Sequence, residues 1–349
     1  MNVEFNTADV KALRTLLEGA RRIMLTCHMS PDGDALGSTL AMRSLLRTMG
    51  KDARVITPDE PPHYLRVIPG ARTVMAWSSF GSRVESLIAG ADLVLCMDYN
   101  GISRLSRLGP AVEATAAPRV LIDHHKNPES FTVLTFSCPD MSSTCELTYH
   151  LIRAMGWEDR IDTEVATCLM SGIITDTGGF HYNSNSPELY RVLASLMERG
   201  VDKDRLMRWL VDTHSAASMR LEAHAIAERM ELFADDHAAL VVLEKDDLDR
   251  FGYKKGDTEG LVNKPLAIPG IIYSCYMRQE KDYIKVSMRS LADFPVDRLC
   301  REYFGGGGHL NAAGGEFRGT MEEAVRIFRE ALPRNRELIS QRALEYADR

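Results

Sequence analysis

The chain lacks the features of an exported or membrane-spanning protein. No apolar run approaches the roughly 18–20 residues that a helix needs to cross a bilayer. The seven cysteines are scattered and form no Cys-x-x-Cys pair, which argues against a disulfide framework and favours reduced thiols. The N-terminal stretch MNVEFNTADV has no apolar core of the kind found in signal peptides. We therefore expect a cytoplasmic protein with no membrane association.

Positive charge is also in deficit. Lys and Arg number 42 against 49 Asp and Glu, which gives a formal net charge of −7. Proteins that coat long duplex DNA are usually basic, so this partner is disfavoured, whereas a small anion held in a local basic pocket is not excluded. No low-complexity tract is present, and 349 residues that are 45% hydrophobic suffice for one large or two ordinary domain cores.

The order of apolar and helical patterns predicts two domains. The first half alternates predicted strands at 22–26, 53–57, 92–97 and 119–122 with predicted helices at 35–49, 142–155 and 164–175. This alternation is typical of an α/β fold with a doubly wound parallel sheet. A charged helical segment follows, and then strands at 238–243, 271–277 and 283–288 indicate a smaller α+β domain. We assign 1–190 to the first domain, 191–232 to a helical linker and 233–349 to the second domain, and we expect a ligand cleft between the two domains.

Acidic and histidine side chains follow the predicted strands of the first domain. They are His28, Asp32 and Asp34 after the first strand, Asp98 after the third, Asp123, His124 and His125 after the fourth, and Asp176 at the end of a helix. Open parallel sheets bind ligands beyond the C-terminal ends of their strands, so these groups can share one edge. Crowded carboxylates raise one another's pKa, and divalent cations relieve that conflict.

The residue types favour two divalent ions. Mixed Asp and His ligation suits Mn²⁺ and tolerates Mg²⁺, Fe²⁺, Co²⁺ or Zn²⁺. Two ions about 3.5–4 Å apart can clamp a phosphoryl group during in-line displacement. Each cluster alone could be a turn or a helix cap. Four clusters at four predicted element ends are harder to explain in that way, and we interpret them together as a dinuclear metal site.

A glycine-rich run in the second domain is a candidate anion site. It matches neither the GxxxxGK[ST] nor the GxGxxG pattern, and alone it could be a flexible loop. Consecutive glycines also let backbone N–H groups turn toward an anion, which favours a phosphate cradle beside a histidine. Arg289, at the end of a predicted strand, could bind a terminal phosphate, although it could also lie on a solvated strand edge. The candidates for substrate binding are Gly306, Gly307, Gly308, His309, Arg289, Ser290 and, less directly, Arg104.

These motifs resemble a known family. The set from His28 to Asp176 resembles the four motifs of the DHH phosphoesterase superfamily. The stretch GGGGHLNAAG, residues 305–314, resembles the signature of the DHH-associated domain. The resemblance runs from about residue 20 to 320, nearly the whole chain. It implies a five-stranded parallel sheet domain, a helical linker and a smaller cap domain.

The resemblance also implies a role for each residue. One metal ion would be held by His28, Asp32 and Asp98, and the other by Asp34, Asp98, His124 and Asp176, with Asp98 bridging. Asp123 would orient a ligand histidine, and His125 would face the substrate phosphate or assist the leaving group. The Arg289–Ser290 pair and His309 would hold another phosphate of the substrate.

The domain arrangement is similar to the bacterial nanoRNase and pAp phosphatase group. It implies hydrolysis of short oligoribonucleotides to mononucleotides, and of 3′-phosphoadenosine 5′-phosphate, by attack of a hydroxide activated by two metal ions. The expected partner is a short single-stranded RNA or a small nucleotide, and a homodimer is kept as a hypothesis. The alternatives are a cyclic di-AMP or pApA phosphodiesterase, an exopolyphosphatase-like hydrolase and an inactive nucleotide-binding module. Four tyrosines could stack on a base or pack in a core: Tyr253, Tyr273, Tyr276 and Tyr283.

Overall fold

The structure, a computed structural model, describes residues 5–348. The chain forms two compact units that divide between Thr213 and His214. This division falls inside the segment predicted as a linker. The helices α7 (Pro187–Glu198) and α8 (Lys203–Met207) belong to the first unit and pack on α6, whereas α9 (Ala216–Glu228) packs on strands of the second. No helix within residues 5–348 has both the length and the apolar character needed to cross a membrane.

The first unit is built on a parallel sheet with the order β3-β2-β1-β4-β5-β6. Its strands are β1 (Arg22–Thr26), β2 (Asp52–Thr57), β3 (Met75–Ala76), β4 (Leu93–Met97), β5 (Arg119–Asp123) and β6 (Leu134–Ser137). The predicted doubly wound α/β fold is confirmed, and the strand order reverses direction between β1 and β4. The sheet has six strands, whereas the sequence patterns predicted four and the family resemblance implied five. The two edge strands β3 and β6 were missed because two and four residues are too short to show an alternating pattern.

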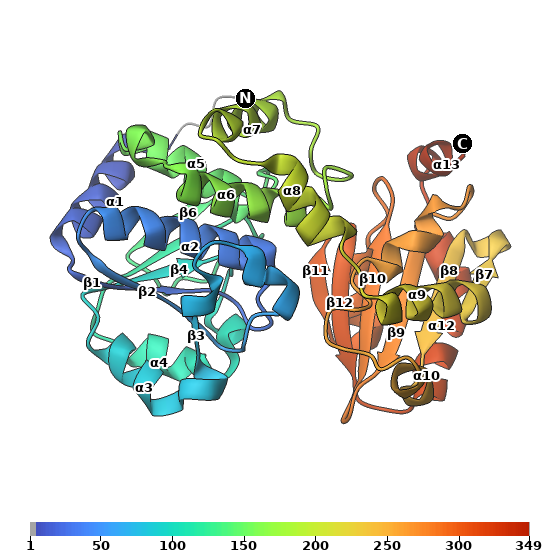
Figure 1. The fold of residues 1–349 in the computed structure, drawn as a ribbon. Coiled ribbons are helices and arrows are strands. Elements are labelled where there is room, and N and C mark those ends of the chain that lie inside the picture. The colour runs from blue at the N-terminus through green and yellow to red at the C-terminus, as the bar shows by residue number, and fades with distance from the viewer. Residues whose placement is uncertain (1–4, 349) are drawn as a thin grey trace. The chain divides into compact units, whose positions relative to one another are not determined.

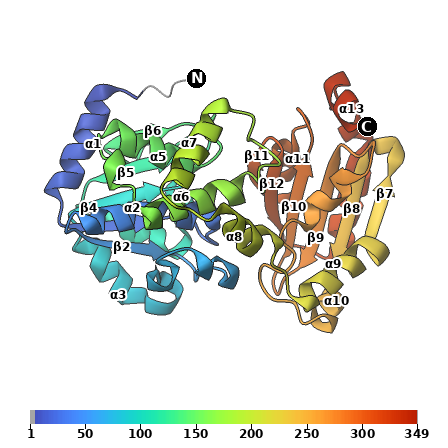
Figure 2. The same ribbon diagram turned by 45° about the horizontal axis from the view of Figure 1, so that its top comes forward.

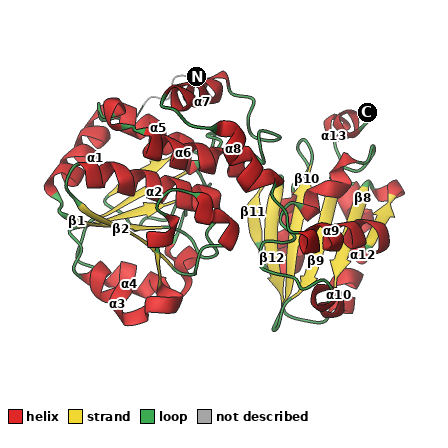
Figure 3. Cartoon of the chain, viewed as in Figure 1, coloured by secondary structure: helices red, strands yellow, loops and turns green. Residues whose placement is uncertain are grey.

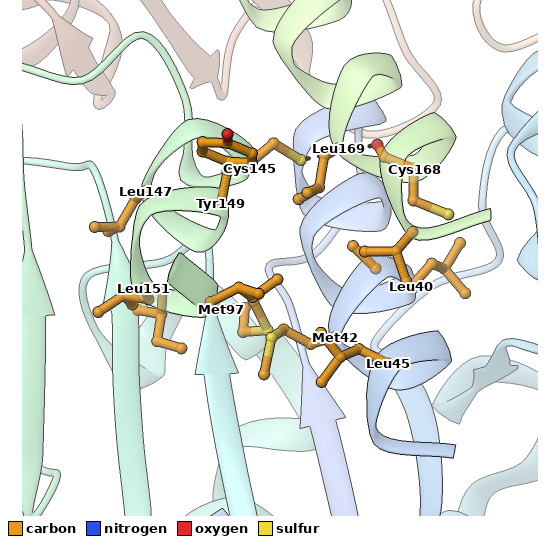
Figure 4. Packing of buried hydrophobic residues seen from close by; sticks show 14 of the residues in the cluster. Leu40, Met42, Leu45, Met97, Cys145, Leu147, Tyr149, Leu151, Cys168 and Leu169 are labelled. Atoms are coloured by element: carbon orange, nitrogen blue, oxygen red, sulfur yellow. Dashed lines mark hydrogen bonds between the residues drawn. The ribbon is translucent and has the colours of Figure 1, made fainter. Parts of the chain in front are cut away.

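Helices cover both faces of this sheet (Figure 1). They are α1 (Thr7–Gly19), α2 (Gly33–Thr48), α3 (Trp77–Ala89), α4 (Gly109–Ala114), α5 (Thr144–Ala154) and α6 (Thr163–Asp176). The larger core lies on the face of α1, α2, α5 and α6, and a smaller core lies under α3 and α4. Figure 4 shows part of the larger core, where Leu40 and Leu45 of α2, Met97 of β4 and Leu169 of α6 come together.

Two glycines allow α2 and α6 to approach closely. A Cβ atom at Gly37 would lie 2.6 Å from the carbonyl oxygen of Cys168. A Cβ atom at Gly172 would clash with Cys145 Sγ and lie 2.8 Å from Asp34 Oδ1. Real side chains do not tolerate such distances, so glycine is required at both positions. The close crossing brings the start of α2, with Asp34, against the C-terminal half of α6.

The second unit contains a mixed sheet with the order β11-β12-β10-β9-β8-β7 (Figure 3). Its strands are β7 (Met230–Phe233), β8 (Ala238–Leu243), β9 (Tyr273–Gln279), β10 (Ile284–Ser290), β11 (Gly307–His309) and β12 (Ala312–Phe317). Among the described strands of this second sheet, only β8 and β9 pair in parallel. Besides α9, its helices are α10 (Lys245–Arg250), α11 (Val296–Phe304), α12 (Met321–Arg336) and α13 (Gln341–Ala347). The larger core joins the sheet to α11, α12 and α13, and a smaller cluster joins it to α9 and α10. Figure 2 shows the ribbons of α9 and α10 next to this sheet.

A buried carboxylate ties α9 to α10. Asp247 is 3% exposed, and its Oδ1 lies 2.7 Å from His224 Nε2 and accepts from Arg229 Nε and Nη2 at 3.1 and 2.8 Å. Its Oδ2 accepts from the backbone N–H of Glu244 and so caps α10. Burial alone would raise the pKa of Asp247, but the hydrogen bonds from Arg229 and His224 outweigh it and lower that pKa.

We expect Asp247→Asn to lower the free energy of unfolding at pH 7 by about 1–3 kcal/mol, because it weakens hydrogen bonds to a charged group. The folded-state pKa lies below the unfolded value of about 3.9, so this contribution is present above that pH and is lost as the pH falls through the folded pKa. Urea unfolding of variant and wild type at pH 7 and pH 3 measures both effects. Asp246→Asn, an exposed residue of the same helical turn, is the matched control.

Candidate metal centre

The predicted strand-end groups of the first unit meet at one edge of its sheet. His28 follows β1, Asp98 follows β4, and Asp123 ends β5 with His124 directly after it. Asp32 caps α2, since its Oδ1 accepts from the backbone N–H groups of residues 34 and 35, both at 3.0 Å. Two further carboxylates complete the set at the ends of helices: Asp34 in the first turn of α2 and Asp176 at the last position of α6.

These side chains form two groups that share one carboxylate. In the first group, His28 Nε2 lies 3.7 Å from Asp32 Oδ2 and 3.4 Å from Asp98 Oδ2. In the second, His124 Nε2 lies 3.8 Å from the other oxygen of Asp98. The same nitrogen lies 3.9 Å from an oxygen of Asp34 and 3.4 Å from one of Asp176. Asp98 therefore presents one oxygen to each group.

The spacing of the donor atoms fits a divalent cation in each group. Metal–ligand bonds of about 2.0–2.2 Å place neighbouring donors about 3–4 Å apart. The distances of 3.4–3.9 Å fall in that range, and all are longer than a good hydrogen bond. Carboxylate and imidazole donors together are also a set that Mn²⁺ and related ions accept.

Backbone carbonyls fix the orientation of both histidines. His28 Nδ1 lies 2.8 Å from the carbonyl oxygen of Met29, and His124 Nδ1 lies 3.3 Å from that of Met141. A carbonyl oxygen can only accept, so each Nδ1 carries the hydrogen. In the neutral ring, each Nε2 then keeps its lone pair, which faces the carboxylates, and this tautomer is the one that can bind a metal ion.

The N-terminus of α5 holds two of the carboxylates. The backbone N–H groups of Thr144 and Cys145 donate to Asp34 at 2.7 and 2.9 Å. The Thr144 hydroxyl donates to Asp98 Oδ1 at 2.8 Å, and the threonine side chain is fully buried. Sequence reasoning missed Thr144. The only local signal was the helix cap at Ser143, which places the next residues at the start of the helix.

Asp98 occupies an unusual backbone conformation. Its φ is +62°, in the left-handed region that aspartate tolerates better than most residues. Its side chain is almost completely buried, and its backbone N–H donates to the carbonyl of Ile122 at 3.0 Å. Strained residues persist where the surroundings over-determine them, and they gather at functional sites.

Burial and the crowding of charges shift the pKa values of the groups in this cluster. Burial, and then the carboxylates of Asp98 and Asp176, raise the pKa of Asp34 well above its ordinary value. Burial alone would lower the pKa of His28, but Asp32 and Asp98 raise it well above its ordinary value. The cluster thus attracts positive charge, which either protons or divalent cations can supply.

Asp123 orients a different histidine from the one expected. Its Oδ1 lies 2.7 Å from Nδ1 of His125, whereas Nδ1 of the presumed ligand His124 faces a backbone carbonyl. Side chains two residues apart point to the same side of an extended chain, which explains the pairing of residues 123 and 125. Asp123 is completely buried, and within the described residues its Oδ2 has no hydrogen-bond partner.

The structure also brings Arg104 to this edge. It lies in the 3₁₀ segment η3 (Ile102–Leu108), and its carbonyl oxygen accepts from the backbone N–H of Met29 at 2.8 Å. Its Nε is buried and has no hydrogen-bond partner within the described part of the chain. The backbone of Arg104 thus lies beside the loop that carries His28, and a guanidinium is a group that binds anions.

The predicted anion residues of the second unit lie on and beside β10 and β11, the two strands that flank β12 in the sheet. Arg289 of β10 pairs with Ala312 of β12, which in turn pairs with His309 of β11. Side chains on paired residues share a face of the sheet, so the arginine and the histidine lie on one face. The Ser290 hydroxyl instead donates to the carbonyl of Phe294 at 2.7 Å and accepts from Asn311 at 2.9 Å.

The glycine run is a hairpin instead of an open loop. Gly307 and Gly308 belong to β11 and pair with β12. A Cβ atom at Gly306 or Gly308 would clash with carbonyl oxygens of β12. These glycines are therefore required for the close approach of two strands, a reason that the sequence pattern did not reveal.

Two family models match the chain. The first, described as the DHH family, N-terminal domain, matches residues 22–173. The second, described as the DHHA1 domain, matches residues 237–334. The first range contains every strand-end group described above except Asp176, and the second contains the glycine hairpin.

Known proteins resemble the chain along nearly its whole length. The bifunctional oligoribonuclease and PAP phosphatase NrnA of Thermus thermophilus is 30% identical over 317 residues, which cover 89% of this chain and 90% of the relative. The crystal structure of an exopolyphosphatase-related protein from Bacteroides fragilis has a TM-score of 0.93 and 39% identity, over 97% of this chain and 99% of that one. RecJ of Thermus thermophilus in complex with Mn²⁺ shares the fold at 14% identity, with a TM-score of 0.52, over 97% of this chain and 55% of RecJ.

Proposed function

Because the chain belongs to the DHH family of metal-dependent phosphoesterases, we propose that it hydrolyses short oligoribonucleotides to mononucleotides. We propose 3′-phosphoadenosine 5′-phosphate as a second substrate. The observation that carries this proposal is the pair of donor groups that share Asp98. The named activities of the Thermus thermophilus relative support the choice of substrates.

Two divalent ions would occupy the two donor groups. His28, Asp32 and Asp98 would hold one ion, and Asp34, Asp98, His124 and Asp176 would hold the other. Mn²⁺ is the proposed metal, with Mg²⁺, Co²⁺ and Fe²⁺ as alternatives; the Mn²⁺ complex of RecJ supports this choice. Such ions lower the pKa of water and neutralise the charge that develops on a phosphoryl group.

The remaining residues would bind the substrate and move a proton. Asp123 orients the ring of His125, because its Oδ1 lies 2.7 Å from Nδ1 of that histidine. We assign to the other ring nitrogen, Nε2, a proton or a hydrogen bond for the departing ester oxygen. Arg104 would hold the phosphate near the metal ions. Arg289, His309 and the hairpin of Gly306, Gly307 and Gly308 would bind another phosphate of the substrate. Ser290 would support this hairpin through Asn311.

Product analysis of 5′-phosphorylated diadenylate tests the proposal. The protein is incubated with the dinucleotide and Mn²⁺, and then with excess chelator. Mn²⁺-dependent release of AMP is the expected result. No release from a folded protein with bound metal would overturn the oligoribonuclease assignment. Cyclic di-AMP, polyphosphate and 3′-phosphoadenosine 5′-phosphate in the same assay separate the remaining substrate classes.

We expect Thr144→Val to weaken Mn²⁺ binding by about 10–100-fold, because hydrogen bonds that orient metal ligands typically contribute that much. Valine matches the shape of threonine but cannot donate to Asp98. Isothermal titration of the metal-free protein with Mn²⁺ measures the effect. Thr144→Ser keeps the hydroxyl and should restore the affinity. Equal affinities for all three proteins would show that the hydroxyl plays no part in ligand orientation.

A further inference from the structure

Three of the tyrosines considered for base stacking are buried or covered by other side chains. Tyr273 and Tyr276 are 0% and 4% exposed, and the ring of Tyr273 stacks on Phe294 with a centroid distance of 4.4 Å. Tyr253 is half-buried and lies under the guanidinium of Arg278 at 4.8 Å. A ring that receives a nucleobase must be exposed, so these three rings are poor candidates.

A loop of the first unit is attached to the metal centre at both ends. It begins directly after Asp176, whose carboxylate faces His124 at 3.4 Å. At its other end, Asn183 Nδ2 donates to the carbonyl oxygen of Met141 at 3.3 Å. The same carbonyl faces His124 Nδ1. The segment from 177 to 183 therefore lies beside the second donor group.

Internal hydrogen bonds fold this loop tightly. The backbone N–H groups of His181 and Tyr182 both donate to the carbonyl oxygen of Thr177, at 2.9 and 3.1 Å. The N–H of Phe180 donates to the Thr177 hydroxyl at 3.1 Å. Three consecutive residues from Gly178 onward have positive φ values of 56°, 68° and 72°. The loop thus has a defined shape.

Tyr182 lies near the end of this loop. Its side chain is 47% exposed, so a large part of the ring faces solvent. The ring also packs on the backbone of Gly178, where any Cβ atom would clash with ring carbons and the phenol oxygen. Gly178 is therefore required for its φ of +56° and for the space that the ring occupies. One part of the phenol ring rests on the loop and another part faces solvent.

We propose that Tyr182 is a stacking platform for a nucleobase of the substrate. The inference rests on the proposed function, because it requires a nucleotide whose phosphoester lies at the metal centre. Stacking on an aromatic ring tolerates every base, since each base has a π face. A single tyrosine beside the reacting phosphate therefore suits an enzyme that cleaves short RNA of any sequence. The platform adds affinity for nucleotides and none for phosphoesters that lack a base.

The test compares two substrates with matched variants. One substrate is 5′-phosphorylated diadenylate, and the other is the same dinucleotide without its bases. Tyr182→Leu keeps apolar cover over Gly178 but cannot stack, and Tyr182→Phe keeps the stacking ring. Tyr190→Ala is the control, since Tyr190 is an equally exposed tyrosine, at 52%, on helix α7.

We expect Tyr182→Leu to raise KM for the diadenylate by about 5–100-fold and to leave KM for the base-free analogue unchanged. Tyr182→Phe and Tyr190→Ala should match the wild type on both substrates. A Tyr182→Leu variant that loses both substrates equally, or neither, would overturn the platform while wild-type hydrolysis upholds the proposed function. If the wild type hydrolyses neither substrate in the presence of Mn²⁺, the proposed function and the platform are overturned together.

Discussion

Replacing Asp98 with asparagine is expected to abolish Mn²⁺-dependent hydrolysis and to prevent both metal ions from binding at micromolar concentration. Asp98 presents one oxygen to each donor group, so the change weakens both sites at once. Removing a residue that merely orients a ligand costs about 10–100-fold in metal affinity, and loss of the shared ligand should exceed that. Asparagine tolerates the left-handed backbone at this position, so the fold should persist.

Equilibrium dialysis followed by metal analysis measures the number of ions bound per chain, and the rate of AMP release measures activity. Asp52→Asn is the matched control, because Asp52 is exposed at the N-terminal end of β2, the opposite end of the strand from the site. An Asp98→Asn protein that binds two ions per chain and keeps wild-type turnover would refute the shared-ligand arrangement.

Asp123→Asn should have the opposite signature, a large loss of rate with metal content intact. The carboxylate of Asp123 faces His125 Nδ1 at 2.7 Å and no other described nitrogen at hydrogen-bond distance. An asparagine amide can donate to that nitrogen and so stabilise the tautomer with the hydrogen on Nε2. In a catalytic Asp–His pair of a serine protease, the same change lowers kcat by about 10⁴-fold, and we expect at least about 100-fold here.

Single-turnover rates and metal content of the variant separate a loss of catalytic rate from a loss of bound metal. The double variant Asp123→Asn/His125→Ala provides the sharper control. If Asp123 acts only through His125, the second change should add little to the first, which is the non-additivity expected of coupled residues. Additive losses would show that the buried carboxylate acts independently of that histidine.

The meeting of these donor groups was predictable because parallel strands all place their C-terminal residues at one edge of the sheet. His28, Asp98 and His124 could be placed there from strand positions alone. The partner of Asp123 could not, since it depends on which way two successive histidines point after β5. Thr144 was missed for a related reason. Its hydroxyl meets Asp98 across 46 residues of sequence, and a helix-cap pattern reports only on local backbone groups.

The glycine-rich signature shows a second limit of sequence patterns. A run of glycines is compatible with an anion cradle, a flexible loop or a close contact between strands. The clash that a Cβ atom would make at Gly306 or Gly308 shows that the close contact between strands is present, and that information exists only in three dimensions. The anion cradle stays a proposal, because close strand packing and phosphate binding can both use these glycines. The short edge strands β3 and β6 were lost for a simpler reason, because so few residues cannot establish a period.

Gly172 affects both the packing of two helices and the position of a carboxylate at the candidate metal centre. It sets how closely α2 and α6 approach, and a Cβ atom there would lie 2.8 Å from an oxygen of Asp34. A larger residue would force the α2 backbone to retreat, and the carboxylate would retreat with it. During evolutionary drift, packing density at this helix crossing and affinity for cations therefore cannot be adjusted independently.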